Sequence, residues 1–250
     1  MAEPWKTAWI CGASTGIGRE LALMLAKKGV KTAVSARSED KLAALAAEHK
    51  NLFPYPLDVT DAEGAAETVA RIEGDLGALD LSVLNAGDYS PMTLDTFDRD
   101  QIKRILDVNY MGVINGVDAL LPGLKARGKG HLAITASVAG YRGLPKAAAY
   151  GPTKAALINF CECLKNEFDD IGATLTVINP GFVRTPLTDQ NDFEMPYLVE
   201  PEDAAKTIYQ GLKKKKFEIA FPAPFVRQLK IARILPYGWY FPMIRKSTGL

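Results

Sequence analysis

Short apolar runs alternate with longer stretches of helical periodicity along most of the chain, and this alternation limits the possible folds more than any other feature. The runs with the length and composition of buried strands are residues 7–11, 31–36, 52–57, 79–84, 131–135 and 175–178. Apolar residues at helical spacing occupy residues 17–28, 38–50, 61–73, 98–121, 148–170 and 201–213. Parallel strands need crossover helices, which cover both faces of their sheet. We therefore predict a single α/β domain with a doubly wound parallel sheet.

The composition excludes several other classes of protein. The 250 residues suffice for one such domain, and 30 Lys and Arg against 29 Asp and Glu leave no overall charge that would attract nucleic acid. Cys11, Cys161 and Cys163 have neither zinc spacing nor a disulfide framework. The first residues lack the apolar core of a signal peptide. We expect a protein of the reducing cytoplasm with no bound metal and no nucleic-acid partner.

A glycine-rich turn follows the first predicted strand. Gly12, Gly16 and Gly18 stand in the segment Cys-Gly-Ala-Ser-Thr-Gly-Ile-Gly, between that strand and the next predicted helix. Glycines mark turns more often than nucleotide sites. In this context, however, they let the backbone approach a pyrophosphate, which the N-terminus of the helix stabilises. The segment therefore predicts a dinucleotide site, although its spacing differs from Gly-x-Gly-x-x-Gly.

Tyr150 and Lys154 are four residues apart and share one face of a predicted helix. An ammonium group near the phenol would favour the phenolate and lower the pKa of Tyr150, at about 1.4 kcal/mol for each pKa unit. Pro152 is tolerated only in the first turn, so this helix should begin close to Tyr150. The pattern predicts a tyrosine that acts as an acid or a base.

Taken together, these segments resemble the short-chain dehydrogenase/reductase family, in its type of about 250 residues, over residues 6–221. The resemblance implies a Rossmann-type sheet of about seven strands. It also implies a catalytic set, which is Asn109, Ser137, Tyr150 and Lys154. The implied cofactor-binding residues are Gly12, Ser14, Thr15, Gly16, Ile17, Gly18, Arg37, Asp58, Val59, Asn85, Ala86, Gly87, Tyr150, Lys154, Pro180, Gly181, Val183 and Thr185. Cys11 and Leu84 depart mildly from the family pattern.

The end of the second predicted strand indicates which cofactor is used. Enzymes of this type that use NAD usually carry an acidic residue here, where this chain has Ala36. Arg37 can pair with a 2′-phosphate, and Ser35 or Ser38 could add hydrogen bonds. NADP(H) is therefore expected rather than NAD, unless Arg37 is merely an exposed loop cation.

The expected substrate site is mainly apolar. Residues 182–200 lack a regular pattern and are predicted to form a mobile lid. The expected substrate-binding residues are Ser137, Tyr141, Leu144, Tyr150 and Phe182. A hydrophobic ketone, aldehyde or secondary alcohol would suit such a pocket, although several of these side chains could instead belong to the core.

Residues 222–250 form an extension beyond the predicted domain of residues 1–221. Aromatic and basic side chains are interleaved there, and Pro236, Gly238 and Pro242 break the apolar stretch, which is too short to span a bilayer. The extension could pack on the domain or its substrate cleft, seal a subunit contact, or lie peripherally on a membrane.

The sequence thus predicts an NADP(H)-dependent oxidoreductase that interconverts a hydrophobic carbonyl compound and an alcohol by hydride transfer. The alternative is a non-catalytic NADP-binding regulatory or scaffold protein of the same fold. The family resemblance further suggests a homodimer or homotetramer built on the helices at residues 98–121 and 148–170.

Overall fold

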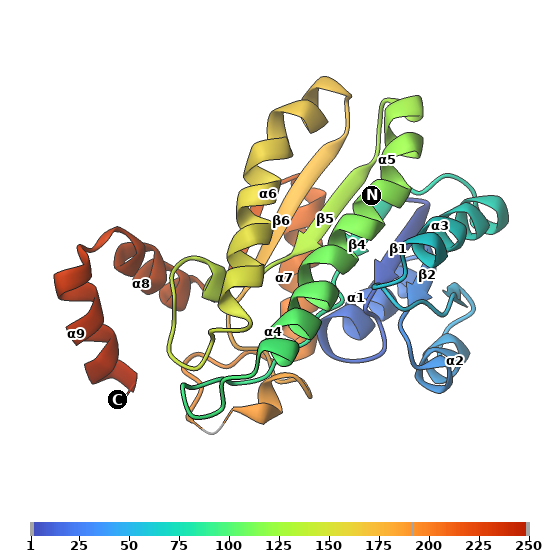
Figure 1. The fold of residues 1–250 in the computed structure, drawn as a ribbon. Helices are drawn as coiled ribbons and strands as arrows, with labels where there is room; N and C mark the ends of the chain where they lie inside the picture. Colours follow the sequence, from blue (N-terminus) through green and yellow to red (C-terminus); the bar gives the residue numbers. More distant parts are fainter. Residues whose placement is uncertain (1–2, 192, 249–250) are drawn as a thin grey trace.

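The computed structural model describes residues 3–191 and 193–248. The outermost residues of the predicted domain and extension, and lid residue 192, lie outside this part of the chain. Seven parallel strands form one sheet in the order β3-β2-β1-β4-β5-β6-β7 (Figure 1). The strands are β1 (Thr7–Cys11), β2 (Lys31–Ser35), β3 (Leu52–Pro54), β4 (Leu81–Leu84), β5 (His131–Thr135), β6 (Thr174–Pro180) and β7 (Glu218–Phe221). The prediction of a doubly wound parallel sheet is confirmed.

Helices cover both faces of this sheet (Figure 1). They are α1 (Gly16–Lys27), α2 (Glu39–Ala47), α3 (Ala62–Leu76), α4 (Arg99–Leu106), α5 (Gly112–Arg127), α6 (Gly151–Asp170), α7 (Pro201–Lys213), α8 (Ala223–Ile234) and α9 (Tyr237–Thr248). One apolar cluster joins α3, α5, α6 and α8 to the sheet, and a second joins α1, α2 and α7 to it. The sheet is therefore buried on both sides, as its apolar strands require.

The single helix predicted at residues 98–121 is interrupted in the structure. A π-helical turn, η1 (Asp107–Met111), separates α4 from α5, and the N–H of Gly112 donates to the carbonyl of Asp107 five residues earlier. Such wide turns are often found at functional sites. Asn109 lies in this turn and is completely buried.

The largest differences from the predicted strands are at β3 and β7. β3 ends at Pro54, three residues earlier than predicted, although the N–H groups of Tyr55 and Leu57 still donate to the carbonyls of Val34 and Ala36. β7 was not located in the sequence, since it has only four residues and alternates between buried and half-buried positions.

Beyond β7 the chain forms α8 and α9, which project from the side of the domain (Figure 1). Phe225 and Val226 of α8 belong to the core cluster. Among the described residues, none of the helices combines the length and the apolar character needed to cross a bilayer.

Candidate active site

The switch point of the sheet lies between β1 and β4, where the strand order reverses, and a cleft opens beside the carboxyl ends of the strands there. This cleft has a volume of about 500 Å³. Its lining includes every predicted cofactor-binding residue except Gly18, and it also includes Ser137. The turn after β1, the ends of β4 and β5, and the start of α6 thus meet around one cavity.

The glycine turn is shaped by close contacts between backbones. Gly12 has a φ of +89°, and a Cβ atom there would lie 2.4 Å from the backbone nitrogen of Ala86. A Cβ atom at Gly18 would lie 2.1 Å from the carbonyl oxygen of Gly12, inside the turn. Gly12 and Gly18 therefore allow the start of α1 to pack against the end of β4, and Gly18 supports the cleft from behind.

The N-terminus of α1 fits the pyrophosphate of a dinucleotide. Thr15 precedes the helix in an extended conformation, and its side chain makes no capping hydrogen bond. The first turn carries no acidic residue, and Ser14, Thr15, Gly16 and Ile17 all line the cleft. The N–H groups and the positive end of the helix dipole are thus available to an anion.

Arg37 and Ser38 follow β2 and line the same cleft, together with Lys41 of α2. Arg37 also borders a second hollow of about 660 Å³. The sequence analysis did not identify Lys41, which could have been found from its spacing of four residues after Arg37. Ser35 cannot contribute as expected, because it is fully buried and its hydroxyl accepts a hydrogen bond from the indole nitrogen of Trp9 at 2.9 Å.

Asp58 lines the same cleft as Arg37. Its carboxylate accepts hydrogen bonds from the backbone N–H and the hydroxyl of Thr60. These bonds, with help from the charge of Arg37, lower the pKa of Asp58. Asp58 therefore stays ionised and partly balances the positive charge of Arg37 at this end of the cleft.

Ser137, Tyr150 and Lys154 converge at the other end. Ser137 follows β5, while Tyr150 directly precedes α6, which begins at Gly151 with Pro152 in its first turn. The Nζ atom of Lys154 lies 5.6 Å from the centre of the Tyr150 ring and donates to the carbonyl of Thr135 at 3.0 Å. The three side chains expected to act together therefore share one wall of the cleft.

The pKa of Tyr150 is raised, whereas the sequence predicted that it would be lowered. Burial raises it to about 12, and a hydrogen bond with Ser137 opposes this rise only in part. Burial also lowers the pKa of Lys154 to about 8. The predicted depression of the Tyr150 pKa by Lys154 is thus wrong for this structure, because the cost of burying a charged phenolate dominates.

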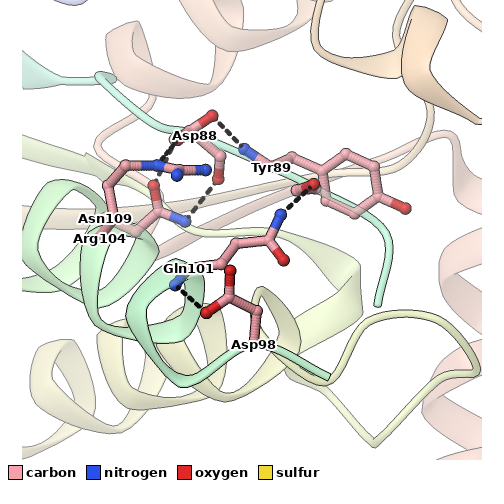
Figure 2. A network of polar contacts seen from close by, with 7 residues as sticks. Asp88, Tyr89, Asp98, Gln101, Arg104 and Asn109 are labelled. Atoms are coloured by element: carbon pink, nitrogen blue, oxygen red, sulfur yellow. Dashed lines mark hydrogen bonds and ion pairs between the residues drawn. The ribbon is translucent and has the colours of Figure 1, made fainter. Parts of the chain in front are cut away.

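Asn109 organises the neighbouring loop through its side chain (Figure 2). Its Oδ1 accepts from the N–H of Asp88 at 2.6 Å, and its Nδ2 donates to the carbonyl of Asp88 at 2.9 Å. Nδ2 also lies 3.2 Å from the hydroxyl of Thr153, one residue before Lys154. Asn109 thereby ties the loop after β4 to the start of α6, although it does not itself line the cleft.

Tyr89 is a further residue of the site. Its ring meets that of Tyr150 edge to face, with the ring centres 5.2 Å apart, and its hydroxyl donates to Asn191 of the lid at 2.8 Å. Its position shortly after Asn85-Ala86-Gly87 suggested a wall of the substrate pocket, but its contact with Tyr150 is seen only in the folded chain. Tyr89 connects the predicted lid to the wall of the cleft that carries Tyr150.

Three expected substrate residues do not line the cleft. Tyr141 points into the core, where its hydroxyl donates to Glu218 at 2.5 Å. Phe182 stacks on Phe225 with ring centres 5.5 Å apart, and Leu144 lies outside the cleft lining. Pro186, Leu187, Thr188 and Gln190 of the lid line it instead.

An α/β fold with a cleft at the switch point of its sheet is typical of nucleotide-binding proteins. A family model described as short chain dehydrogenase matches residues 6–195. The chain belongs to this family and is a short-chain dehydrogenase/reductase, that is, an oxidoreductase.

Individual proteins agree with this assignment. An uncharacterized oxidoreductase of Myxococcus xanthus is 36% identical over 241 residues, covering 94% of this chain and 95% of the relative. The protein named "Probable oxidoreductase EphD" from Mycobacterium tuberculosis is 35% identical over 254 residues, and the match spans only 43% of its length. An alcohol dehydrogenase from Thermococcus sibiricus, solved in complex with 5-hydroxy-NADP, superposes with a TM-score of 0.78 at 28% identity. That match covers 87% of this chain and 96% of the other.

Proposed function

We propose that this enzyme transfers hydride between NADP(H) and a hydrophobic ketone, aldehyde or secondary alcohol, with Tyr150 as its acid and base. The observation that carries the proposal is the position of Ser137, Tyr150 and Lys154 on one wall of the cleft that also receives the glycine turn. Hydride chemistry needs the cofactor and the proton donor at one carbonyl group, and this arrangement brings their binding elements together.

The bound nicotinamide supplies the hydride in reduction and accepts it in oxidation. Tyr150, with a pKa of about 12, is protonated at neutral pH and donates its proton to the carbonyl oxygen. Ser137 holds the same oxygen by a hydrogen bond, which strengthens as negative charge develops there. Asn109 and Thr135 act indirectly. Asn109 positions the loop after β4, and the carbonyl of Thr135 positions the ammonium group of Lys154.

NADP(H) is the proposed cofactor because positive charge gathers where a 2′-phosphate would bind. Arg37, Ser38 and Lys41 line this end of the cleft. Ala36 stands where an NAD-binding enzyme would have an acidic residue that bonds the ribose 2′-hydroxyl. The complex of the Thermococcus relative with 5-hydroxy-NADP supports the same choice. NAD remains the weaker ligand in this proposal.

A hydrophobic substrate is supported by the side chains around the lid. Phe182, Phe193 and Phe225 form an aromatic cluster outside the cleft lining, in which the Phe182 and Phe193 rings lie 5.7 Å apart. Pro186 and Leu187 add apolar surface to the cleft itself.

We also propose a homo-oligomer that pairs the outer faces of α4, α5 and α6. Leu106 of α4 and Met111 of the π-helical turn η1, between α4 and α5, expose 41% and 42% of their surface, as expected for a contact between subunits. Light scattering should give a multiple of the 27.2 kDa chain mass, and a mass of one chain would refute this part. The exposed free thiol of Cys163 on α6 favours a reducing cytoplasm.

The test of the function is a fluorescence titration with NADPH and NADH, followed by a panel of apolar ketones in the same sample. We expect tighter binding of NADPH and its oxidation by at least one ketone. If the folded protein bound neither nucleotide, the glycine turn would be only structural and the non-catalytic alternative would take its place.

A further inference from the structure

The C-terminal helices expose an unusual amount of apolar surface. Ile231 and Ile234 of α8 are 60% and 80% exposed, while Tyr237 and Trp239 of α9 are 70% and 72% exposed. Half of the large apolar side chains that are exposed among the described residues belong to these two helices. Exposed apolar surface on this scale marks a contact with a partner or a membrane.

α8 is divided into two distinct faces. Phe225, Val226 and Ala232 are buried on its inner face. Arg227, Lys230, Ile231 and Ile234 are exposed and follow the i, i+3, i+4, i+7 spacing of a single helical face. The outer face is therefore both apolar and basic, and the inner face already holds the helix on the domain.

α9 continues the same surface. Tyr237 and Phe241 stack with ring centres 5.6 Å apart, and Trp239 lies between them in sequence. Aromatic side chains of this kind are favourable at the boundary between lipid and water. We call the exposed sides of α8 and α9 the C-terminal surface.

The charge of the segment has one sign. Residues 223–248 contain five Lys and Arg residues and no Asp or Glu. Lys230 pairs with Glu218 of β7. The C-terminal surface is thus cationic, whereas the chain as a whole has a net charge of only +1.

The C-terminal surface is fixed to the loop before Tyr150. Arg142 donates to the carbonyls of Arg233 and Leu235 at 3.1 and 2.7 Å, at the end of α8. Its guanidinium also lies 3.9 Å from the centre of the Tyr240 ring, and the hydroxyl of Tyr240 donates to the carbonyl of Gly143. Arg142 therefore joins both helices to the loop that links Ser137 to Tyr150.

We propose that the C-terminal surface docks the enzyme on an anionic lipid bilayer, with α8 and α9 lying in the interface. Apolar burial and attraction between Lys or Arg and anionic headgroups act together in such docking. A two-fold contact between copies would place this patch against itself and bring like charges together. The positive charge of the C-terminal surface thus favours a lipid bilayer over a second copy of the chain as its binding partner. The proposal is independent of the catalytic function, except that docking holds the 138–149 loop close to the membrane.

The first test is sedimentation of the intact protein with sucrose-loaded vesicles. One set contains phosphatidylcholine alone, and the other contains 30% phosphatidylglycerol, with the composition chosen to give roughly the surface potential of a natural anionic leaflet. We expect binding to the anionic vesicles that weakens as salt is added. Absence of binding to anionic vesicles at low salt would overturn the proposal.

Two sets of substitutions distinguish the electrostatic from the apolar contribution to vesicle binding. Replacing Arg227, Arg233 and Lys246 with Gln should weaken partitioning by about a hundredfold, at roughly fivefold per cation. The pair Ile231→Ser and Ile234→Ser should weaken it by at least about tenfold. As a matched control, Leu94→Ser with Phe97→Ser removes residues that are 93% and 62% exposed elsewhere, and should leave binding unchanged. Equal loss in the control would refute a specific surface.

Trp239 provides a direct reading of the contact. Trp5 and Trp9 are buried at 6% and 0% exposure, so brominated lipids should quench only Trp239. We expect quenching in the wild-type protein and its loss in Trp239→Phe. A fall in oligomer mass in the Ile231→Ser and Ile234→Ser variant, without any quenching in the wild type, would assign the surface to a second copy and reject the membrane proposal.

Discussion

Removal of the charge of Arg37 should reduce the affinity for NADPH and leave the affinity for NADH unchanged. Arg37 and Lys41 line the cleft together at the end of β2, whereas Ser35 is occupied by Trp9. A hydrogen bond to a charged group contributes about 1.5–3 kcal/mol, which corresponds to a factor of roughly 10 to 150 in Kd. Because Arg37 is exposed and Lys41 stays in place, we expect the lower part of this range, about 10- to 30-fold.

The assay is a fluorescence titration of Arg37→Ala with both reduced nucleotides at fixed ionic strength. Arg99→Ala is the control, because the side chain of Arg99 is 90% exposed and pairs only with Asp100 among the recorded ion pairs. Ala36→Asp should act in the same direction, since a carboxylate there repels a 2′-phosphate and can bond a 2′-hydroxyl. Equal weakening of NADPH and NADH by Arg37→Ala, or no change in either, would refute this account of cofactor choice.

Two further predictions concern stability. Burial lowers the pKa of His131 to about 4, against about 6.5 in the unfolded chain, so the unfolded state binds the proton first as the pH falls. Urea unfolding should show a loss of about 3 kcal/mol from this group between pH 6.5 and 4, and His131→Gln should reduce the slope by that amount; an unchanged slope would contradict the assignment. Gly18→Ala should destabilise the fold severely, because its Cβ would lie 2.1 Å from the Gly12 carbonyl, whereas Gly74→Ala in α3 meets nothing within 4 Å and should stabilise by about 0.5–1 kcal/mol. Equal melting temperatures for the two glycine variants would show that the turn is not as tight as described.

The parts of the fold that could be predicted are those encoded locally. The glycine turn, the helix start at Pro152 and the four-residue spacing of Tyr150 and Lys154 can each be read from a short stretch of sequence. The alternation of strands and helices likewise predicted the parallel sheet. Burial of Asn109 in a π turn was not predictable in this way, because it depends on its bonds to Asp88 across the site.

The remaining differences arise from packing between distant segments. Ser35 is withdrawn from the cofactor by Trp9 of the adjacent strand, and Tyr141 turns into the core toward Glu218. The direction of the Tyr150 pKa depends on burial, which a spacing of residues cannot reveal. Tyr89 reaches Tyr150 from another loop, so only the folded chain brings them together.

The central claim is that Tyr150 supplies the proton in a hydride-transfer reaction. The most direct measurement compares the wild type, Tyr150→Phe and the control variant Tyr55→Phe. The hydroxyl of Tyr55, which the control removes, donates a hydrogen bond to Asp75. The binding of NADPH, and the oxidation of NADPH in the presence of a ketone that the wild-type enzyme reduces, are followed in the same samples. We predict unchanged NADPH binding in all three, and a loss of turnover by at least about a hundredfold in Tyr150→Phe alone. Turnover by Tyr150→Phe at the wild-type rate would contradict the claim.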